Sequence, residues 1–270
     1  MLKIAFIFLI YSTINHEELW HTFFKNVDKD KYNIYIHYKN DVKLKYFDDY
    51  KINETVSTKY ADISIVKAQN HMLQEALKDI NNTHFIFLSG ACIPLKSFTH
   101  IYNKLDNKFS YFHVADKEDC LPDCENALKY IDIKYLNKAS QWCILNRKHA
   151  ILIVNGANYY KNAYCCRTLN YLVWFEKSYA PDELCYITFL SRIFNNKLEN
   201  EIIVTNYKYP PEYATTFANW EGMNYEYVSN KELKNYLYII NLSDKNLIID
   251  DYTIISNDEK NFLIYKKNLK

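Results

Sequence analysis

The segment HFIFLSGACIPL, residues 84–95, decides the fold class of this chain. Its apolar run, Phe85 to Leu88, is typical of a strand that is buried on both faces in a parallel sheet covered by helices. Ser89 and Gly90 end the run and Pro94 follows, so we expect a turn just past the carboxyl end of this strand. Ligands of open α/β sheets bind at that edge. Two interpretations of residues 89–94 are open: the turn only connects a core strand to the surface, or it also contributes to a ligand-binding site.

Alternating strands and helices precede this central strand. We expect strands at residues 3–10 and 32–37, with a helix between them whose apolar residues recur at helical spacing. A second helix is expected over residues 63–77 and delivers the chain to residue 84. This order predicts an α/β fold with a mixed, mostly parallel central sheet flanked by helices. No linker or repeat divides the chain, so we expect one domain over residues 1–270.

The second half of the chain continues the pattern less regularly. A charged stretch at residues 117–137 reads as a long surface loop beside a site. Further elements are expected as helices at 98–105, at 147–154 and from Ala180 onward, and as strands at 111–114, 140–145, 202–205 and 215–218. The tail from Lys231 onward is less clearly patterned and closes on residues 262–267, where Lys266 and Lys267 follow a short apolar strand.

Composition excludes several classes of function. The net charge is +1 with 24% charged residues, which gives no global field for nucleic acid or a membrane surface. The chain has three glycines and neither a dinucleotide fingerprint nor a P-loop. Aromatic residues make up 17% of the chain, including 26 tyrosines. They could line a sugar-binding groove, although an AT-rich genome explains most of the excess.

The cysteines and the N-terminus bear on the compartment. Seven cysteines without a C-x-x-C pair favour reduced, mostly buried thiols. The apolar run Ile4 to Ile10 is too short to span a bilayer, and no cleavage-like site follows it. We therefore predict a soluble, cytoplasmic protein without an integral membrane segment.

Two acids, Asp182 and Glu183, follow Pro181 at the expected start of a helix. A carboxylate among apolar and aromatic neighbours, as Glu183 is, can act as the general base that deprotonates a hydroxyl. The alternative is that both acids only cap the helix and complement its dipole.

Charged groups elsewhere have equally open interpretations. His37, at the end of the second strand, either touches a ligand or is an ordinary buried or surface residue. Lys266 and Lys267 could neutralise a diphosphate or belong to a solvated tail. The sequence Asp28-Lys-Asp30 matches a D-x-D metal motif, but it precedes the second strand instead of following a central one. We predict that it holds no metal.

Six blocks of sequence carry a resemblance to a known family. They are IYIH (34–37), DISIVKAQNHMLQEAL (62–77), HFIFLSGACIPLKSF (84–98), KASQWCILNRKHAILIV (138–154), APDE (180–183) and TTFANW (215–220). In this order they resemble the core-2/I-branching enzyme family of glycosyltransferases, family 14, and especially its compact plant-type branch. The likeness runs from the first strand to about Trp220.

The resemblance implies a GT-A type, Rossmann-like nucleotide-sugar transferase fold. It also implies an inverting, metal-independent transfer from a UDP-sugar, with N-acetylglucosamine favoured and xylose next, to a hydroxyl of a glycan or glycoside acceptor. UDP-sugar is then a substrate, and no cofactor is expected. The linkage formed would be β, as in a β-1,6-N-acetylglucosaminyltransferase.

The resemblance also assigns roles to residues. Glu183 matches the family's catalytic base, His37 lies in the nucleotide-binding region, and Lys267, with Lys266 beside it, matches the lysine that helps replace a metal at the diphosphate. Ser89 and Gly90 are expected beside the donor. Candidates for the sugar groove are Trp142, Asp182 and Trp220, and the aromatic ring of Trp174 is also expected to offer a face to the sugar.

One position departs from the family pattern. Tyr213 stands where the family has an arginine at the diphosphate. Three explanations are open. Lys208 or Lys266 takes over the role of this arginine, the alignment is shifted at this position, or stabilisation of the leaving group is impaired. The last possibility keeps open an alternative function, a catalytically weak nucleotide-sugar or glycan-binding relative.

Overall fold

The computed structural model describes residues 2–94, 97–115, 124–158, 170–206, 216–217, 252–257 and 263–267, with side chains up to residue 203. A six-stranded sheet runs through its centre, in the order β2-β1-β3-β6-β5-β7. Its strands are β1 (Ile4–Ile10), β2 (Tyr32–Tyr38), β3 (His84–Ser89), β5 (Ser110–Val114), β6 (Ile144–Asn146) and β7 (Ile202–Asn206).

Strand directions make the sheet mixed but mostly parallel. β1 pairs in parallel with β2 and β3, and β5 pairs in parallel with β7. β6 is antiparallel to both of its neighbours, β3 and β5. The predicted fold class, a mostly parallel α/β sheet flanked by helices, is confirmed.

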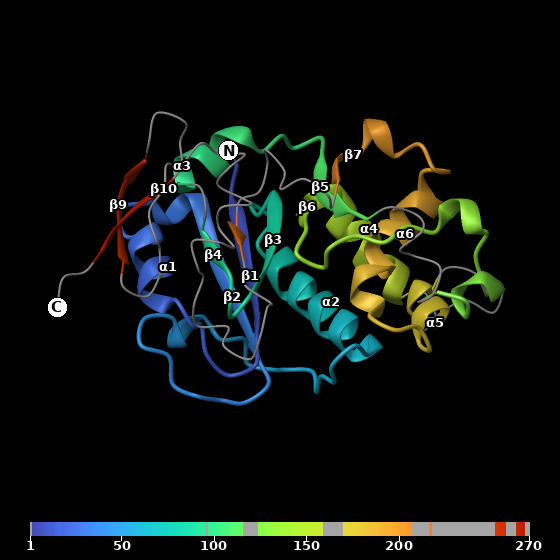
Figure 1. Ribbon diagram of the computed structural model, residues 1–270, viewed down its shortest axis with the longest axis horizontal. Helices are drawn as coiled ribbons and strands as arrows, with labels where there is room; N and C mark the ends of the chain where they lie inside the picture. The colour runs from blue at the N-terminus through green and yellow to red at the C-terminus, as the bar shows by residue number, and fades with distance from the viewer. Residues whose placement is uncertain are drawn as a thin grey trace.

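Alternating side chains of the central strands divide the core into two layers. In β3, Phe85 and Phe87 join the cluster on one face, whereas Ile86 and Leu88 join the cluster on the other. Because successive side chains in a strand point to opposite faces, a run without polar residues must be covered on both sides. Figure 1 shows helices on both sides of the sheet. They are α1 (Glu17–Phe24) and α3 (Phe98–Lys104) on one side, and α2 (Ile63–Leu77), α4 (Arg147–Asn158), α5 (Tyr171–Phe175) and α6 (Cys185–Ile193) on the other.

Trp20 anchors α1 to the sheet. Its ring is fully buried and lies edge-on to Phe8 of β1, with ring centroids 5.1 Å apart. Its indole N–H donates to the carbonyl of Cys92 at 2.8 Å. One side chain thus fixes both the helix and the segment that follows β3.

Helix α2 has the bounds that the sequence predicts. Asp62 begins it by accepting a hydrogen bond from the Ser64 N–H at 2.9 Å. At the other end, the Arg147 guanidinium donates to the carbonyls of Leu77, Asp79 and Asn82. Arg147 therefore satisfies the carbonyl of the last residue of α2, which has no intrahelical partner, and two carbonyls of the segment that follows.

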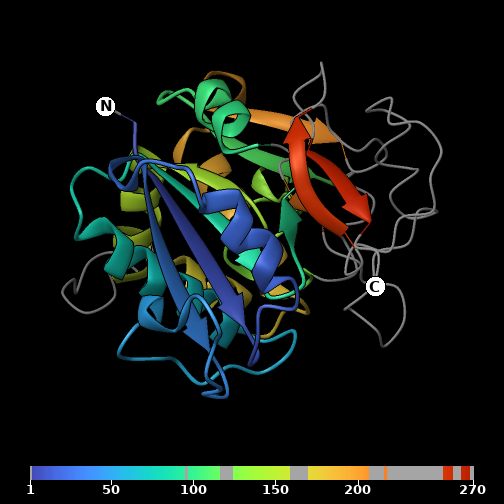
Figure 2. The same ribbon diagram turned by 90° about the vertical axis from the view of Figure 1, so that its left-hand side faces the viewer.

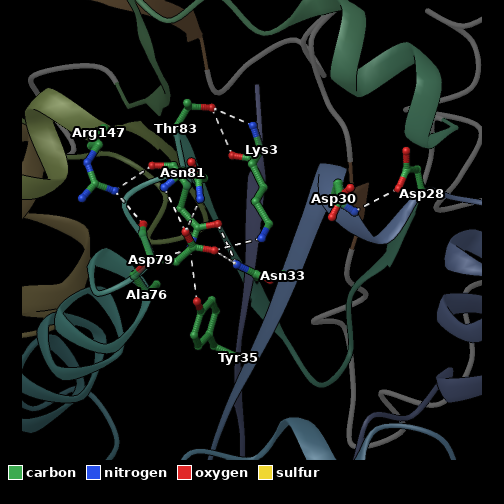
Figure 3. Close-up of polar contacts among 11 residues, drawn as sticks. Lys3, Asp28, Asp30, Asn33, Tyr35, Ala76, Asp79, Asn81, Thr83 and Arg147 are labelled. Atoms are coloured by element: carbon green, nitrogen blue, oxygen red, sulfur yellow. Dashed lines mark hydrogen bonds and ion pairs between the residues drawn. The ribbon is translucent and has the colours of Figure 1, made fainter. Parts of the chain in front are cut away.

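A polar network ties together the amino ends of the first three strands (Figure 3). The Asp79 carboxylate accepts from Lys3 at 2.9 Å and from Asn33 at 2.7 Å. The hydrogen bond from Lys3 lowers the pKa of Asp79 well below its usual range. Asn82 extends the network to the Tyr35 hydroxyl at 3.1 Å. This end of the sheet is consequently closed by partnered polar groups.

The D-x-D sequence at residues 28–30 has a local structural role. Asp28 accepts from the backbone N–H of Asp30 at 3.1 Å and caps a short 3-10 turn before β2 (Figure 3). This is the usual behaviour of an aspartate at a turn.

Two sequence-based assignments need correction. The described part of the predicted surface loop at 117–137 contains 3-10 turns and is only partly at the surface. Leu128, Tyr130 and Ile133 are exposed, whereas other apolar side chains are buried in the core: Cys124, Ala127, Ile131, Tyr135 and Leu136. The strand predicted at 140–145 is shorter, because the Trp142 N–H donates to the Ser140 hydroxyl at 3.2 Å and forms a local turn before β6.

Two further strand pairs lie outside the main sheet. β4 (Ile93–Pro94) pairs with β8 (Thr216–Phe217), and β9 (Tyr252–Asn257) pairs with β10 (Leu263–Lys267), both antiparallel. Figures 1 and 2 place the β9 and β10 pair beside α1. Within the described ranges, every cysteine is free and buried, and none of the helices is long and apolar enough to cross a bilayer.

Candidate active site

A cavity of about 830 Å³ opens at the carboxyl ends of β1 and β3. This size lies within the range of small-molecule sites, about 300–1,000 Å³. Its walls come from the ends of the strands, the segment before α2, the turn before β6 and the turn before α6. The lining residues are Leu9, Ile10, Tyr11, Ser12, Thr13, Asn15, Lys39, Thr58, Lys59, Tyr60, Ala61, Ile65, Ser89, Gly90, Ala91, Ser140, Gln141, Trp142, Ala180, Asp182 and Glu183.

Gly90 allows the loops after β1 and β3 to approach each other. A Cβ atom at this position would collide with the carbonyl oxygen of Thr13. The Gly90 carbonyl in turn accepts a hydrogen bond from the Asn15 N–H at 2.8 Å. Only glycine fits between these two backbones, so it sets the shape of the cavity floor.

Ser89 forms the turn that follows β3. Its hydroxyl accepts from the Ala91 N–H at 3.1 Å and lies 3.2 Å from the Cys92 sulfur. The side chain is buried, but the residue lines the cavity. Ser89 and Gly90 are therefore brought to the cavity together, as the sequence predicts.

The turn Pro181–Glu183 carries both acids to the cavity. It starts from Ala180, whose φ of 46° lies in the left-handed region, and Ala61 on another wall has a φ of 51°. Residues with a Cβ pay roughly 1–2 kcal/mol for this conformation, and such strain clusters at functional sites. No side chain caps this turn or α6 by a hydrogen bond, although both acids stand in the first turn, where a negative charge complements the helix dipole.

Glu183 is paired with a lysine that the sequence analysis did not single out. Its Oε2 lies 3.4 Å from the Lys138 Nζ, and the two side chains are 29% and 19% exposed. The Ala139 N–H donates to the Glu183 carbonyl at 2.8 Å, and Ala139 bridges to Val114 of β5. Backbone contacts thus hold Lys138 beside Glu183, and the carboxylate remains open to the cavity.

Asp182 lies in a different environment from its neighbour. The residue is 8% exposed, and its Oδ1 has no hydrogen-bond partner within the described structure. Burial, with a smaller contribution from the charge of Glu183, raises the pKa of Asp182 to about 6. The two adjacent acids are therefore unlike: one is paired with a cation and the other is buried without one.

Aromatic and cationic side chains complete the walls. Tyr60 is 84% exposed, and Trp142 is half-buried. The Lys39 Nζ lies 5.3 Å from the centre of the Tyr11 ring. Lys39 and Lys59 bring positive charge to the cavity, and aromatic faces are available beside it.

His37 is fully buried at the end of β2 and does not line the cavity. The Val56 N–H donates to its Nε2 at 2.9 Å, and burial lowers the pKa of His37. His71 of α2 contacts the Glu54 carbonyl, at 2.8 Å. Both histidines hold the segment that leads to Lys59, so His37 reaches the cavity only through that segment.

Several predicted residues lie outside the described part of the chain. Lys266 and Lys267 belong to the backbone of β10, but their side chains are not described. Trp220, Tyr213 and Lys208 are also outside the described residues. The roles expected for all of these remain predictions.

The structure corrects one expectation about the cavity walls and adds lysines that the sequence did not single out. Trp174, expected to offer a face to sugar rings, is buried in α5 against Phe175 and Phe189. Lys138 and Lys59 were not predicted. Lys39 could have been found, since it directly follows the second strand, whereas the pairing of Lys138 with Glu183 has no local signal. Among the described residues, no group of three or more His, Cys, Asp or Glu could hold a metal ion.

Comparisons with known proteins agree with the resemblance seen in the sequence. A family model described as "Branch: Core-2/I-Branching enzyme" matches residues 4–237. A protein of Oryza sativa subsp. japonica, described as "Glycosyltransferase BC10", is 26% identical over 166 residues. That match covers 56% of this chain and 40% of the rice protein.

Proposed function

The chain belongs to the core-2/I-branching enzyme family, and from that premise we propose that it is an inverting glycosyltransferase that uses a UDP-sugar. The donated sugar would be N-acetylglucosamine, with xylose next, and the acceptor a hydroxyl of a glycan, joined by a β linkage. The observation that carries the proposal is Glu183, a partly exposed carboxylate on the wall of a cavity at the carboxyl edge of the sheet.

The proposed reaction is a single displacement at the anomeric carbon. The acceptor oxygen forms a bond to that carbon as the bond to the UDP oxygen breaks, and the hydroxyl proton passes to the Glu183 carboxylate. Holding base, acceptor and donor in line supplies much of the rate acceleration. Lys138 supports this role because its ammonium, 3.4 Å from Oε2, limits where the carboxylate can point.

The leaving diphosphate needs positive charge as its bond breaks. Within the described cavity lining, the cations are Lys39 and Lys59. We propose that they help to hold the diphosphate, together with the family lysine expected at Lys267, and that no divalent metal is required. The neighbouring strand-end loops at Tyr11 and Gly90 would then hold the nucleoside.

The first test of this proposal is UDP release. The protein is incubated with UDP-N-acetylglucosamine or UDP-xylose, with and without a panel of glycan acceptors, and free UDP and elongated glycans are measured. Transfer from one of these donors is expected. A chain that binds UDP but neither transfers nor hydrolyses either UDP-sugar would be the weak binding relative instead.

UDP binding is expected to persist in excess chelator and to weaken about tenfold or more in Lys59→Met or Lys39→Met. A hydrogen bond to a charged group contributes about 1.5–3 kcal/mol, which corresponds to this range. Calorimetry measures both effects, with exposed Lys104→Met on α3 as the matched control. A tenfold loss of affinity in chelator would contradict metal independence, and unchanged affinity in both lysine variants would remove these lysines from the site.

A further inference from the structure

We propose that the Asp182 carboxylate receives a hydroxyl of the substrate sugar and is a specificity-determining residue of the cavity. This inference rests on the proposed function and extends it to a residue with a role separate from that of Glu183. The shared chemistry is a sugar hydroxyl that donates a hydrogen bond. It can come from the donor sugar or from the acceptor.

The geometry points to Asp182 because one of its carboxylate oxygens lacks a hydrogen-bond partner within the described structure. The residue is 8% exposed and lines the cavity, yet its Oδ1 has no hydrogen-bond partner within the described structure. Buried polar groups in folded proteins are almost always partnered, so each exception needs an explanation. Rotation of a carboxylate about χ2 exchanges its two oxygens at low cost. Either oxygen can therefore face a ligand that enters the cavity.

The backbone around Asp182 is held in place without its side chain. The Glu183 N–H donates to the Ala180 carbonyl at 3.0 Å, and the Leu184 N–H donates to the Pro181 carbonyl at 3.1 Å. No capping hydrogen bond from a side chain supports the turn. The hydrogen bonds that hold the turn are therefore made by its backbone, and the Asp182 Oδ1 is left for a ligand.

The charges around Asp182 explain its protonation. Burial and the nearby charge of Glu183 raise its pKa to about 6, against a hydrogen bond from its own backbone N–H and the weaker effect of the Lys138 charge. The buried Cys185 and the exposed Tyr60 are the other titratable groups that interact with it electrostatically. A sugar hydroxyl that donates to the carboxylate favours the ionised form and so lowers the pKa of Asp182 in the complex. Binding at pH 6 must then release the fraction of a proton that the free Asp182 carboxyl holds at that pH.

Proton release measured by calorimetry tests the inference. At pH 6, titrations in buffers of different ionisation enthalpy are run with UDP, with UDP-N-acetylglucosamine, and with methyl β-galactoside added to the UDP complex. Release of up to about half a proton per sugar is expected, because a group with a pKa near 6 is half protonated there. Release with the UDP-sugar beyond that with UDP assigns the hydroxyl to the donor. Release only on adding the glycoside assigns it to the acceptor.

Asp182→Asn keeps the size of the side chain but replaces the carboxyl by an amide, which does not titrate near pH 6. It is expected to abolish the release and to weaken sugar binding about tenfold, with UDP affinity unchanged, whereas Glu183→Gln keeps the release. Because the pKa of folded Asp182 lies above its unfolded value, ionisation costs stability as pH rises through 6. At pH 7.5 the Tm of Asp182→Asn should therefore be no lower than that of the parent.

Two results would overturn the inference while leaving the proposed function intact. One is UDP-sugar binding with the same proton release in the parent and in Asp182→Asn, or with none in either. The other is an Asp182→Asn variant that melts several degrees lower and binds the sugar normally, which would make the residue structural. Failure of the parent to bind UDP at all would instead overturn the proposed function, and this inference with it.

Discussion

Glu183→Gln is expected to lower sugar transfer by about 10²–10⁴-fold, the usual contribution of a general base. The amide is nearly the same size as the carboxylate, but it cannot accept the hydroxyl proton at neutral pH. The fold should be unaffected, because the hydrogen bonds that hold residue 183 are made by its backbone N–H and carbonyl. Transfer rates are compared at saturating donor, and UDP affinity is measured by calorimetry.

The matched control is Glu176→Gln, which removes an exposed carboxylate just after α5. It should leave transfer within a few fold of the parent. If Glu183→Gln also stayed within a few fold, the base would be another residue, and Asp182 would be the next to test. If the variant lost both stability and UDP binding, Glu183 would be a structural residue, with its pair to Lys138 supporting the turn.

Trp20→Ala is expected to destabilise the protein by about 3–5 kcal/mol, the range for removing a large buried aromatic ring. Trp20 is fully buried and packs against Phe6, Phe8, Phe23 and Phe24. The substitution also leaves the Cys92 carbonyl without its indole donor. Chemical denaturation measures the free energy of unfolding.

Two further variants separate the contributions at this position. Trp20→Phe keeps a ring but loses the N–H donor, so its loss of stability should be intermediate, with about 1–3 kcal/mol from the unpaired carbonyl. Ile80→Ala, at a position that is 79% exposed, should change stability by no more than about 0.5 kcal/mol. A Trp20→Ala variant as stable as Ile80→Ala would contradict the description of α1 as an anchored helix.

The strands and helices that the sequence predicts well are those with an unbroken pattern. The helix over 63–77 has the predicted bounds because Asp62 caps it and its apolar residues keep one face. The run at 85–88 is central because it has no polar residue to place in water. In both cases a local pattern is sufficient, because the residues of the segment itself determine which face is buried and where the element ends.

Other features depend on partners that are distant in sequence. The direction of β6 cannot be read from three residues, and its antiparallel pairing follows from the path of the chain through β5. The buried residues Cys124 and Ala127 lie in a charged segment, so their burial was missed.

The residues of the cavity also divide into those with a local sequence pattern and those that only the tertiary structure brings together. The sequence indicated five of its lining residues, namely Ser89, Gly90, Trp142, Asp182 and Glu183. These positions sit at strand ends or within motifs. Lys59 and Lys138 lie in polar segments with no distinguishing pattern. Only the tertiary structure brings Lys59 to the cavity and Lys138 beside Glu183.

Because of the network around Asp79, one end of the sheet holds the strands and helices together, while the other end carries the cavity. Its hydrogen bonds and the Arg147 cap join β1, β2, β3, α2 and α4 at the end away from the cavity. The loops at the cavity end can therefore change in length or composition without loosening this joint. Such a division favours evolvability: a new ligand specificity can arise by remodelling loops at one end, while the other end retains the fold.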